Sequence, residues 1–234
     1  MPNLIKMSSK ENRKNIINVL INKAAMKQDI ADNSREVFTS FKRIIQDEIF
    51  KIKKEINDKR IRLRFEEQGS YEFRLFIGSD LIVFQLHTNI FRLPDNNQLW
   101  KEKYLFSNPA NGYFGIINIY NFLAESYEKN RFNDIGYLIG RIFMNHDHHF
   151  MVDGQGELGT KFRDLKNSFI SDDIIRQITQ TAIMYAIDFD LITPPYEIIK
   201  EVSLGQFKAI SSDLQLSTGK SMGFKFSNQE SEIV

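Results

Sequence analysis

Residues 135–159, IGYLIGRIFMNHDHHFMVDGQGELG, hold three of the four histidines of this chain. The first ten residues, 135–144, are apolar at both alternating positions, which is typical of a strand that is buried on both faces. A polar turn with three histidines follows, and residues 150–152 predict a short second strand with a glycine-rich exit. We therefore expect 135–144 to be a central strand that delivers the histidines to one end of a sheet, where functional groups are usually presented.

The same sheet begins upstream of this hairpin. From residue 60, apolar side chains alternate with charged ones, and turn signals at 68–70 and 78–80 divide the stretch into three strands. Residues 112–123, GYFGIINIYNFL, are again apolar on both faces and predict a central strand. Together these patterns predict an antiparallel sheet of five or six strands within residues 60–153, built from two hairpin units.

The charged face of the first three strands carries arginines and glutamates. A basic strand face can bind phosphate groups. Charges of both signs on neighbouring strands more often form cross-strand ion pairs on a solvated face, and we expect that arrangement here. The residues concerned are Arg62, Arg64, Arg74, Glu66 and Glu72.

Helical periodicity precedes the sheet. Residues 10–30 and 33–58 predict two N-terminal helices within 1–59, separated by a polar run at 29–34. The second helix has apolar residues at spacings of three and four, which form one continuous seam: Phe38, Phe41, Ile45, Ile49, Ile52 and Ile56. We expect this seam to lie across the sheet. The alternative is a contact with the same helix of a second copy, which would make the protein a homodimer through residues 33–58.

The C-terminal third also has helical character. Residues 160–211 predict two helices, of which the first is capped by Ser171. Residues 227–234 predict a frayed tail. The whole chain, residues 1–234, is therefore expected to form one α+β domain, with an antiparallel sheet flanked by two N-terminal and two C-terminal helices.

The amino-acid composition excludes a few classes of function but does not indicate a specific one. The 31 basic and 30 acidic residues give a net charge of +1, so there is no global attraction to nucleic acid or to an anionic membrane, and such binding would need a local patch. Cysteine is absent, which excludes disulfides, thiolate nucleophiles and cysteine metal sites. No apolar run is long enough to span a bilayer. We expect a cytoplasmic protein that does not enter the membrane.

The histidine turn is the candidate metal site. On an extended chain His146 and His148 point to the same side, and imidazole nitrogens two residues apart can hold one divalent metal ion. Asp153 is the expected third ligand, with His87 as the alternative. Gly140, the two histidines and Asp153 resemble the first motif of the cupins, which implies a metal in a β-barrel. The motif usually has glutamate where this chain has aspartate, and no later histidine follows. The competing interpretation is a solvated hairpin tip.

The stretch from Gly154 to Gly159 has the spacing G-x-G-x-x-G, with Gly156 between. In a dinucleotide-binding fold this loop joins a strand to a helix, and a further strand follows. The residues after Gly159 are predicted to be mixed and then helical, and only 75 residues remain, so most of such a fold could not be built. We expect a tight glycine turn.

Two classes of function follow. The first is a non-catalytic binding or interaction module, whose partner we expect to be a protein or peptide rather than nucleic acid. The alternative is a metal-dependent hydrolase or phosphodiesterase that uses the His-x-His pair at a strand end. We favour the binding module, because every chemical motif is incomplete and the sequence has neither a serine nucleophile elbow nor a cysteine.

Overall fold

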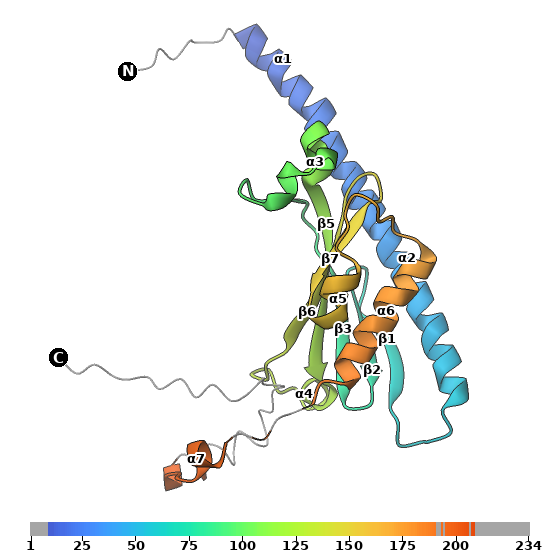
Figure 1. Cartoon of the computed structure of the whole chain (residues 1–234), viewed down its shortest axis with the longest axis vertical. Coiled ribbons are helices and arrows are strands. Elements are labelled where there is room, and N and C mark those ends of the chain that lie inside the picture. The colour runs from blue at the N-terminus through green and yellow to red at the C-terminus, as the bar shows by residue number, and fades with distance from the viewer. Residues whose placement is uncertain (1–8, 191–192, 194, 206, 209–234) are drawn as a thin grey trace, which may run out of the picture.

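The computed structural model describes residues 9–190, 193, 195–205 and 207–208. It has an α+β fold with one antiparallel sheet, as predicted (Figure 1). Six strands pair in the order β1-β2-β3-β5-β6-β7, and the two-residue β4 pairs with β5, so the sheet has seven strands rather than five or six. The strands are β1 (Leu63–Glu67), β2 (Glu72–Ile77), β3 (Asp80–Leu86), β4 (Phe91–Arg92), β5 (Tyr113–Leu123), β6 (Tyr137–Met144) and β7 (Phe150–Gly154).

The N-terminal part is one helical rod and not two helices. The helix α1 (Ser9–Val19), a π-helical turn (Leu20–Ala24) and the helix α2 (Ala25–Glu55) follow one another without a break (Figure 1). The predicted break at 29–34 is wrong. The Ser34 hydroxyl donates a hydrogen bond to the Ile30 carbonyl one turn earlier, at 2.7 Å, so this polar side chain has a partner inside a continuous helix. Ser34 also lies against Gly115, where an added Cβ would come within 1.9 Å of its oxygen. The small side chains allow α2 to approach β5 closely.

The predicted seam of α2 is buried against the chain's own sheet. Phe38, Phe41, Ile45 and Ile49 are each at most 5% exposed and join one apolar cluster with side chains from the sheet, while the last two members of the seam are only partly buried. The interpretation of a helix laid across the sheet is therefore confirmed for residues 38–49. Their apolar face is already occupied, which leaves it unavailable to a second copy.

A second helix covers the same face of the sheet beside α2. This helix, α6 (Asp172–Ile187), begins as predicted with the Ser171 hydroxyl accepting from the Ile174 amide. An ion pair of 2.6 Å joins Asp172 to Arg43 of α2. Two short helices, α5 (Gly156–Lys161) and α7 (Tyr196–Ile199), precede and follow α6 in the chain. Residues 162–170 are not helical, which corrects the predicted helical range of 160–211. Residues 209–211 and the predicted tail at 227–234 lie outside the described residues.

Within the part of the chain that the structure describes, the other face of the sheet is covered only toward its two ends. One end is covered by two 3-10 turns (Gln98–Lys101 and Pro109–Gly112) and the short helix α3 (Lys103–Ser107) between them. The other end is covered by α4 (Ala124–Glu128). Between these two clusters the strands present their side chains to two surface cavities. Among the described residues, no helix combines the length and the apolar composition needed to cross a bilayer.

Candidate functional site

Five polar side chains lie in one line across the open face of the sheet. The strand register places Glu72 opposite Gln85, Gln85 opposite Asn118, Asn118 opposite Arg141, and Arg141 opposite Asp153. Each of these residues lines one of the two cavities on this face. Neighbouring strands are about 4.8 Å apart, so the line, which we name the polar row, is roughly 19 Å long.

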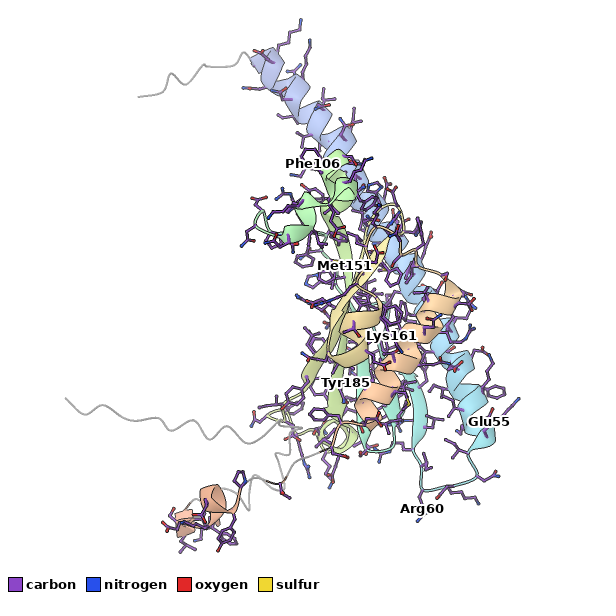
Figure 2. The ribbon with its side chains drawn as sticks, viewed as in Figure 1. Glu55, Arg60, Phe106, Met151, Lys161 and Tyr185 are labelled. Carbon is purple, nitrogen blue, oxygen red and sulfur yellow. The ribbon has the colours of Figure 1, made fainter. Side chains whose placement is uncertain are left out.

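Apolar side chains flank the polar row on both sides. They come from the residues two positions away on the same strands, which share the same face, except for Leu138, which a register shift in the β5–β6 ladder places opposite Tyr120. On one side are Ile116, Phe143 and Met151, the last of which is labelled on β7 in Figure 2, and on the other side are Val83, Tyr120 and Leu138. The open face is therefore a polar track between two apolar borders.

Two cavities meet over this face, because Tyr120 lines both. The larger has a volume of about 810 Å³ and contains the basic side chains Arg92, Arg141 and Arg163. The smaller has a volume of about 410 Å³ and lies over β2, β3 and α4. Volumes of roughly 300 to 1,000 Å³ are usual for ligand sites in proteins.

Asn118 forms the floor of the larger cavity at the centre of the polar row. Asn118 as a whole is only 9% exposed. Within the described part of the chain, its amide has no hydrogen-bond partner. The amide atoms of Asn118 are not among the buried side-chain atoms that lack a partner, so they border the cavity and are accessible to water or to a ligand. Asn118 thus presents, at the centre of the polar row, an amide whose donors and acceptor are available to a partner from outside the chain.

The charges of the larger cavity are mixed, with arginine in excess. Arg141 pairs with Asp153 across the β6–β7 ladder and lies over the Phe143 ring, 5.3 Å from its centroid. Arg92 pairs with its neighbour Asp95. Arg163 is exposed at the edge of the cavity. An anionic group that entered this cavity would meet guanidinium groups, which bind carboxylates and phosphates in a forked geometry.

The arginines at the start of the sheet form ion pairs, but not the expected cross-strand ones. Arg62 lies 3.1 Å from Glu128 of α4. Arg64 and Arg74 each pair with the glutamate two residues away on the same strand, at 3.0 and 2.6 Å. The pairs therefore form along strands and with α4 rather than across strands. With their charges balanced in this way, these arginines offer little attraction to phosphate groups.

The histidine turn is organised by Asn145, which is 1% exposed. Its Oδ1 accepts hydrogen bonds from the backbone amides of Asp147 and His149, both at 3.1 Å. Its Nδ2 donates to the Tyr104 hydroxyl at 2.9 Å and to the Asn111 carbonyl at 3.3 Å. Burial raises the pKa of Tyr104 above its usual value, although the hydrogen bond from Asn145 opposes this. The sequence analysis missed Asn145, but an asparagine that opens a tight turn is a recognised signal for this bonding.

Both ring nitrogens of His146 are already engaged. Nε2 lies 3.0 Å from Asn111 Oδ1, and Nδ1 lies 2.9 Å from Asp147 Oδ1. The Asn33 side chain of α2 also donates to the His146 carbonyl at 3.1 Å. A metal ion needs an imidazole lone pair, so His146 could bind one only after one of these ring contacts breaks.

The other two histidines of the turn lie in different environments. His148 is exposed and has a φ of 60°, in the left-handed region. The turn is therefore not extended, so the two histidines do not have the extended geometry from which we predicted that His146 and His148 point to the same side. His149 is 7% exposed, and its Nδ1 lies 2.9 Å from the Leu165 carbonyl. Its ring lies 3.9 Å from that of Phe169, between centroids, so His149 is a packed residue.

The remaining candidate ligands lie away from the turn. Asp153 is three residues into β7, roughly 10 Å beyond Phe150 along the strand, and it pairs with Arg141. The Nδ1 atom of His87 accepts from the Asn89 amide at 3.1 Å. Over the described residues, no group of three or more histidine, aspartate and glutamate side chains is placed to hold a metal ion. The metal site remains a prediction. The sheet is open, with β1 and β7 at its edges, unlike the barrel that the cupin resemblance implied.

The glycine-rich stretch forms a tight turn between β7 and α5. Gly156 has a φ of 52°, which favours glycine, and a Cβ on Gly159 would lie 2.0 Å from the Gly154 carbonyl oxygen. The expected tight turn is confirmed. The turn also opens a six-residue helix, which the sequence analysis did not predict.

Comparison of the chain with protein-family models, with curated proteins and with solved structures finds no match.

Proposed function

We propose that this protein is a non-catalytic binding module that holds an extended segment of a protein or peptide partner across the open face of its sheet. The observation that carries the proposal is the unpartnered amide of Asn118 at the centre of the polar row. Asparagine and glutamine amides each offer donors and an acceptor, which is what the backbone of a peptide needs. Asn118 and Gln85 are adjacent in the row and supply two such amides.

The dimensions and the borders of the row suit an extended peptide. A length of roughly 19 Å corresponds to about six residues at 3.3 Å each. Alternate side chains of such a segment would point toward the sheet and contact the apolar borders, including Tyr120 and Phe143. The arginines of the larger cavity favour a partner with an acidic side chain or a terminal carboxylate near one end of the segment.

The same charges favour a peptide over nucleic acid. Affinity for nucleic acid depends mainly on neutralising consecutive phosphates with basic residues. The polar row ends in Glu72 and Asp153, and its one arginine, Arg141, is already paired with Asp153, so the row has no run of basic side chains along which a phosphate backbone could lie. A peptide with one acidic group tolerates this arrangement.

A peptide selection tests the proposal. A displayed library of random peptides is selected on the wild-type protein, and the affinity of the enriched peptides is measured by fluorescence polarisation. We expect the Asn118→Leu variant, which keeps the side-chain volume but removes the amide, to bind them at least about tenfold more weakly. Asn167→Leu is the matched control, because Asn167 is exposed and distant in sequence from the strands of the row. Equal affinity for the wild type and Asn118→Leu would contradict the proposal.

The metal-dependent hydrolase or phosphodiesterase remains the alternative, and metal analysis separates the two functions. The binding module needs no metal, so untagged protein is expected to contain no stoichiometric zinc, manganese or iron. About one equivalent of metal that disappears in the variant His146→Ala/His148→Ala would support the hydrolase. The absence of cysteine suits a reducing compartment, and we propose a cytoplasmic location for the module.

A further inference from the structure

The N-terminal section of the helical rod projects beyond the sheet (Figure 1). Neither α1 nor the π-helical turn that follows buries a single residue. Five large aliphatic side chains on this section are between 48% and 65% exposed: Ile16, Ile17, Val19, Leu20 and Ile21. Exposed aliphatic side chains that gather on one segment indicate an interaction surface for another molecule or a membrane.

The same section is basic, although the whole chain is nearly neutral. Residues 9–27 contain five basic side chains and one acidic side chain, so 5 − 1 gives a local charge of +4, against +1 for the full chain. The basic residues stand on both sides of the aliphatic run, at Lys10, Arg13, Lys14, Lys23 and Lys27. This is the local patch that the overall charge balance conceals.

The orientation of the rod leaves part of the aliphatic run facing away from the sheet. Lys23 and Lys27 lie over the Tyr113 ring, 5.7 and 5.6 Å from its centroid, so their side of the helix faces the start of β5. Side chains two positions apart on a helix point to nearly opposite sides. Ile21 therefore points away from the sheet, and Ile17, one turn earlier, shares its side. A flat surface can reach both without meeting the sheet.

We propose that residues 9–27 dock onto an anionic lipid surface. The aliphatic side chains would enter the boundary between headgroups and acyl chains, and the basic side chains would lie among the headgroups. Aliphatic residues flanked by lysine and arginine on a helix are the pattern that such surface binding requires. Asp29 and Asp32, both on the next turns of the rod, limit the segment at its C-terminal side. This inference does not depend on the proposed peptide site.

The charges disfavour two other occupants. In a pair of such helices from two copies, the ends of the aliphatic run are basic in either orientation, so like charges would face each other. Nucleic acid would attract the basic residues, but its phosphate backbone would not bury the aliphatic side chains of Ile17 and Ile21. An anionic lipid surface satisfies both features at once.

Vesicle flotation with the full chain tests the proposal. We expect binding to phosphatidylcholine vesicles that contain about 30% phosphatidylserine, binding at least about tenfold weaker to pure phosphatidylcholine, and weakening in high salt. Ile17→Ser/Ile21→Ser should reduce binding at least about tenfold, because the insertion is lost. The matched control is Ile61→Ser/Ile135→Ser, which removes two isoleucines of similar exposure, 46% and 61%, from outside the rod. Circular dichroism checks that each variant stays folded.

Three results would overturn the proposal. The first is the absence of binding to the anionic vesicles. The second is unchanged binding by Ile17→Ser/Ile21→Ser, which would reduce the contact to surface charge alone. The third is a wild-type dimer in sedimentation experiments that this variant converts to a monomer, which would show that a second copy covers the run.

Discussion

Replacing Asn145 by alanine removes four hydrogen bonds from the turn between β6 and β7 at once. The Asp147 amide is on an exposed residue, so water can replace its lost acceptor. The His149 amide and the Asn111 carbonyl belong to residues that are 7% and 4% exposed and would keep no equivalent partner. The cost therefore comes mainly from these two buried groups.

The size of the effect follows from the usual cost of such groups. At roughly 1 to 3 kcal/mol for each buried donor or acceptor left unpaired, the variant should lose about 3 kcal/mol of the free energy of unfolding. For a chain of this length, that loss corresponds to a fall in Tm of roughly 6 to 12 °C. The strands of the hairpin should remain paired, because the backbone hydrogen bonds of β6 and β7 do not involve the Asn145 side chain.

Urea unfolding followed by circular dichroism gives the measurement. Asn167→Ala is the matched control, since the side chain of Asn167 bonds only to exposed Asp164, and a change within about 0.5 kcal/mol is expected. A loss below about 1 kcal/mol for Asn145→Ala would refute the reasoning. It would mean that water enters the turn and replaces the bonds that Asn145 makes.

Three further predictions concern the core, the glycine turn and a buried tyrosine. Ile45→Asp places a charge where the side chain is fully buried, which costs several kcal/mol and should abolish cooperative unfolding; a stable, folded variant would show that the seam is not core. Gly159→Ala should cost about 1 to 3 kcal/mol in urea unfolding, because its Cβ would meet the Gly154 carbonyl, whereas Gly140→Ala, with its nearest atoms at 3.5 Å, should be tolerated. Because burial raises the pKa of Tyr104, its neutral form is favoured in the folded state. The contribution of Tyr104 to the free energy of unfolding should therefore be fully present below a pH of about 10 and be lost as the pH rises further. The variant Tyr104→Phe should make that fall in stability shallower.

The fold was predictable where the local pattern and the packing agree. The central strands β5 and β6 were recognised because they are apolar on both faces, and the structure places them between other strands. The N-terminal helix was wrongly divided, because residues 29–34 include good cap residues. Whether Ser34 ends a helix depends on Gly115, which is far away in the sequence and gives it room to pack.

The candidate site was harder to predict, since it depends on which strands pair and in what register. In the sequence, histidines and carboxylates stand out where they gather in polar turns. The polar row instead takes one residue from each of five strands, and its members align only when the register is known. Asn118 did give a signal, as a polar residue within a strand that is otherwise apolar on both faces. Only the strand register shows that Asn118 lies between Gln85 and Arg141 and is part of a row of polar side chains.

The sequential order of the sheet has a consequence for how the chain folds as it is synthesised. Apart from β4, each strand pairs with strands that are its neighbours along the chain, so the strand pairs can form one after another. The loops within β1–β2–β3 and between β6 and β7 are short, whereas residues 87–112 separate β3 from β5 and residues 124–136 separate β5 from β6. Folding that relies on such local pairing is fast. The helix α2 is made before any strand, and its apolar seam has no partner until the sheet exists. During synthesis, the seam is therefore exposed longest, and a nascent chain halted before β5 should be the form most prone to aggregation and most dependent on chaperones.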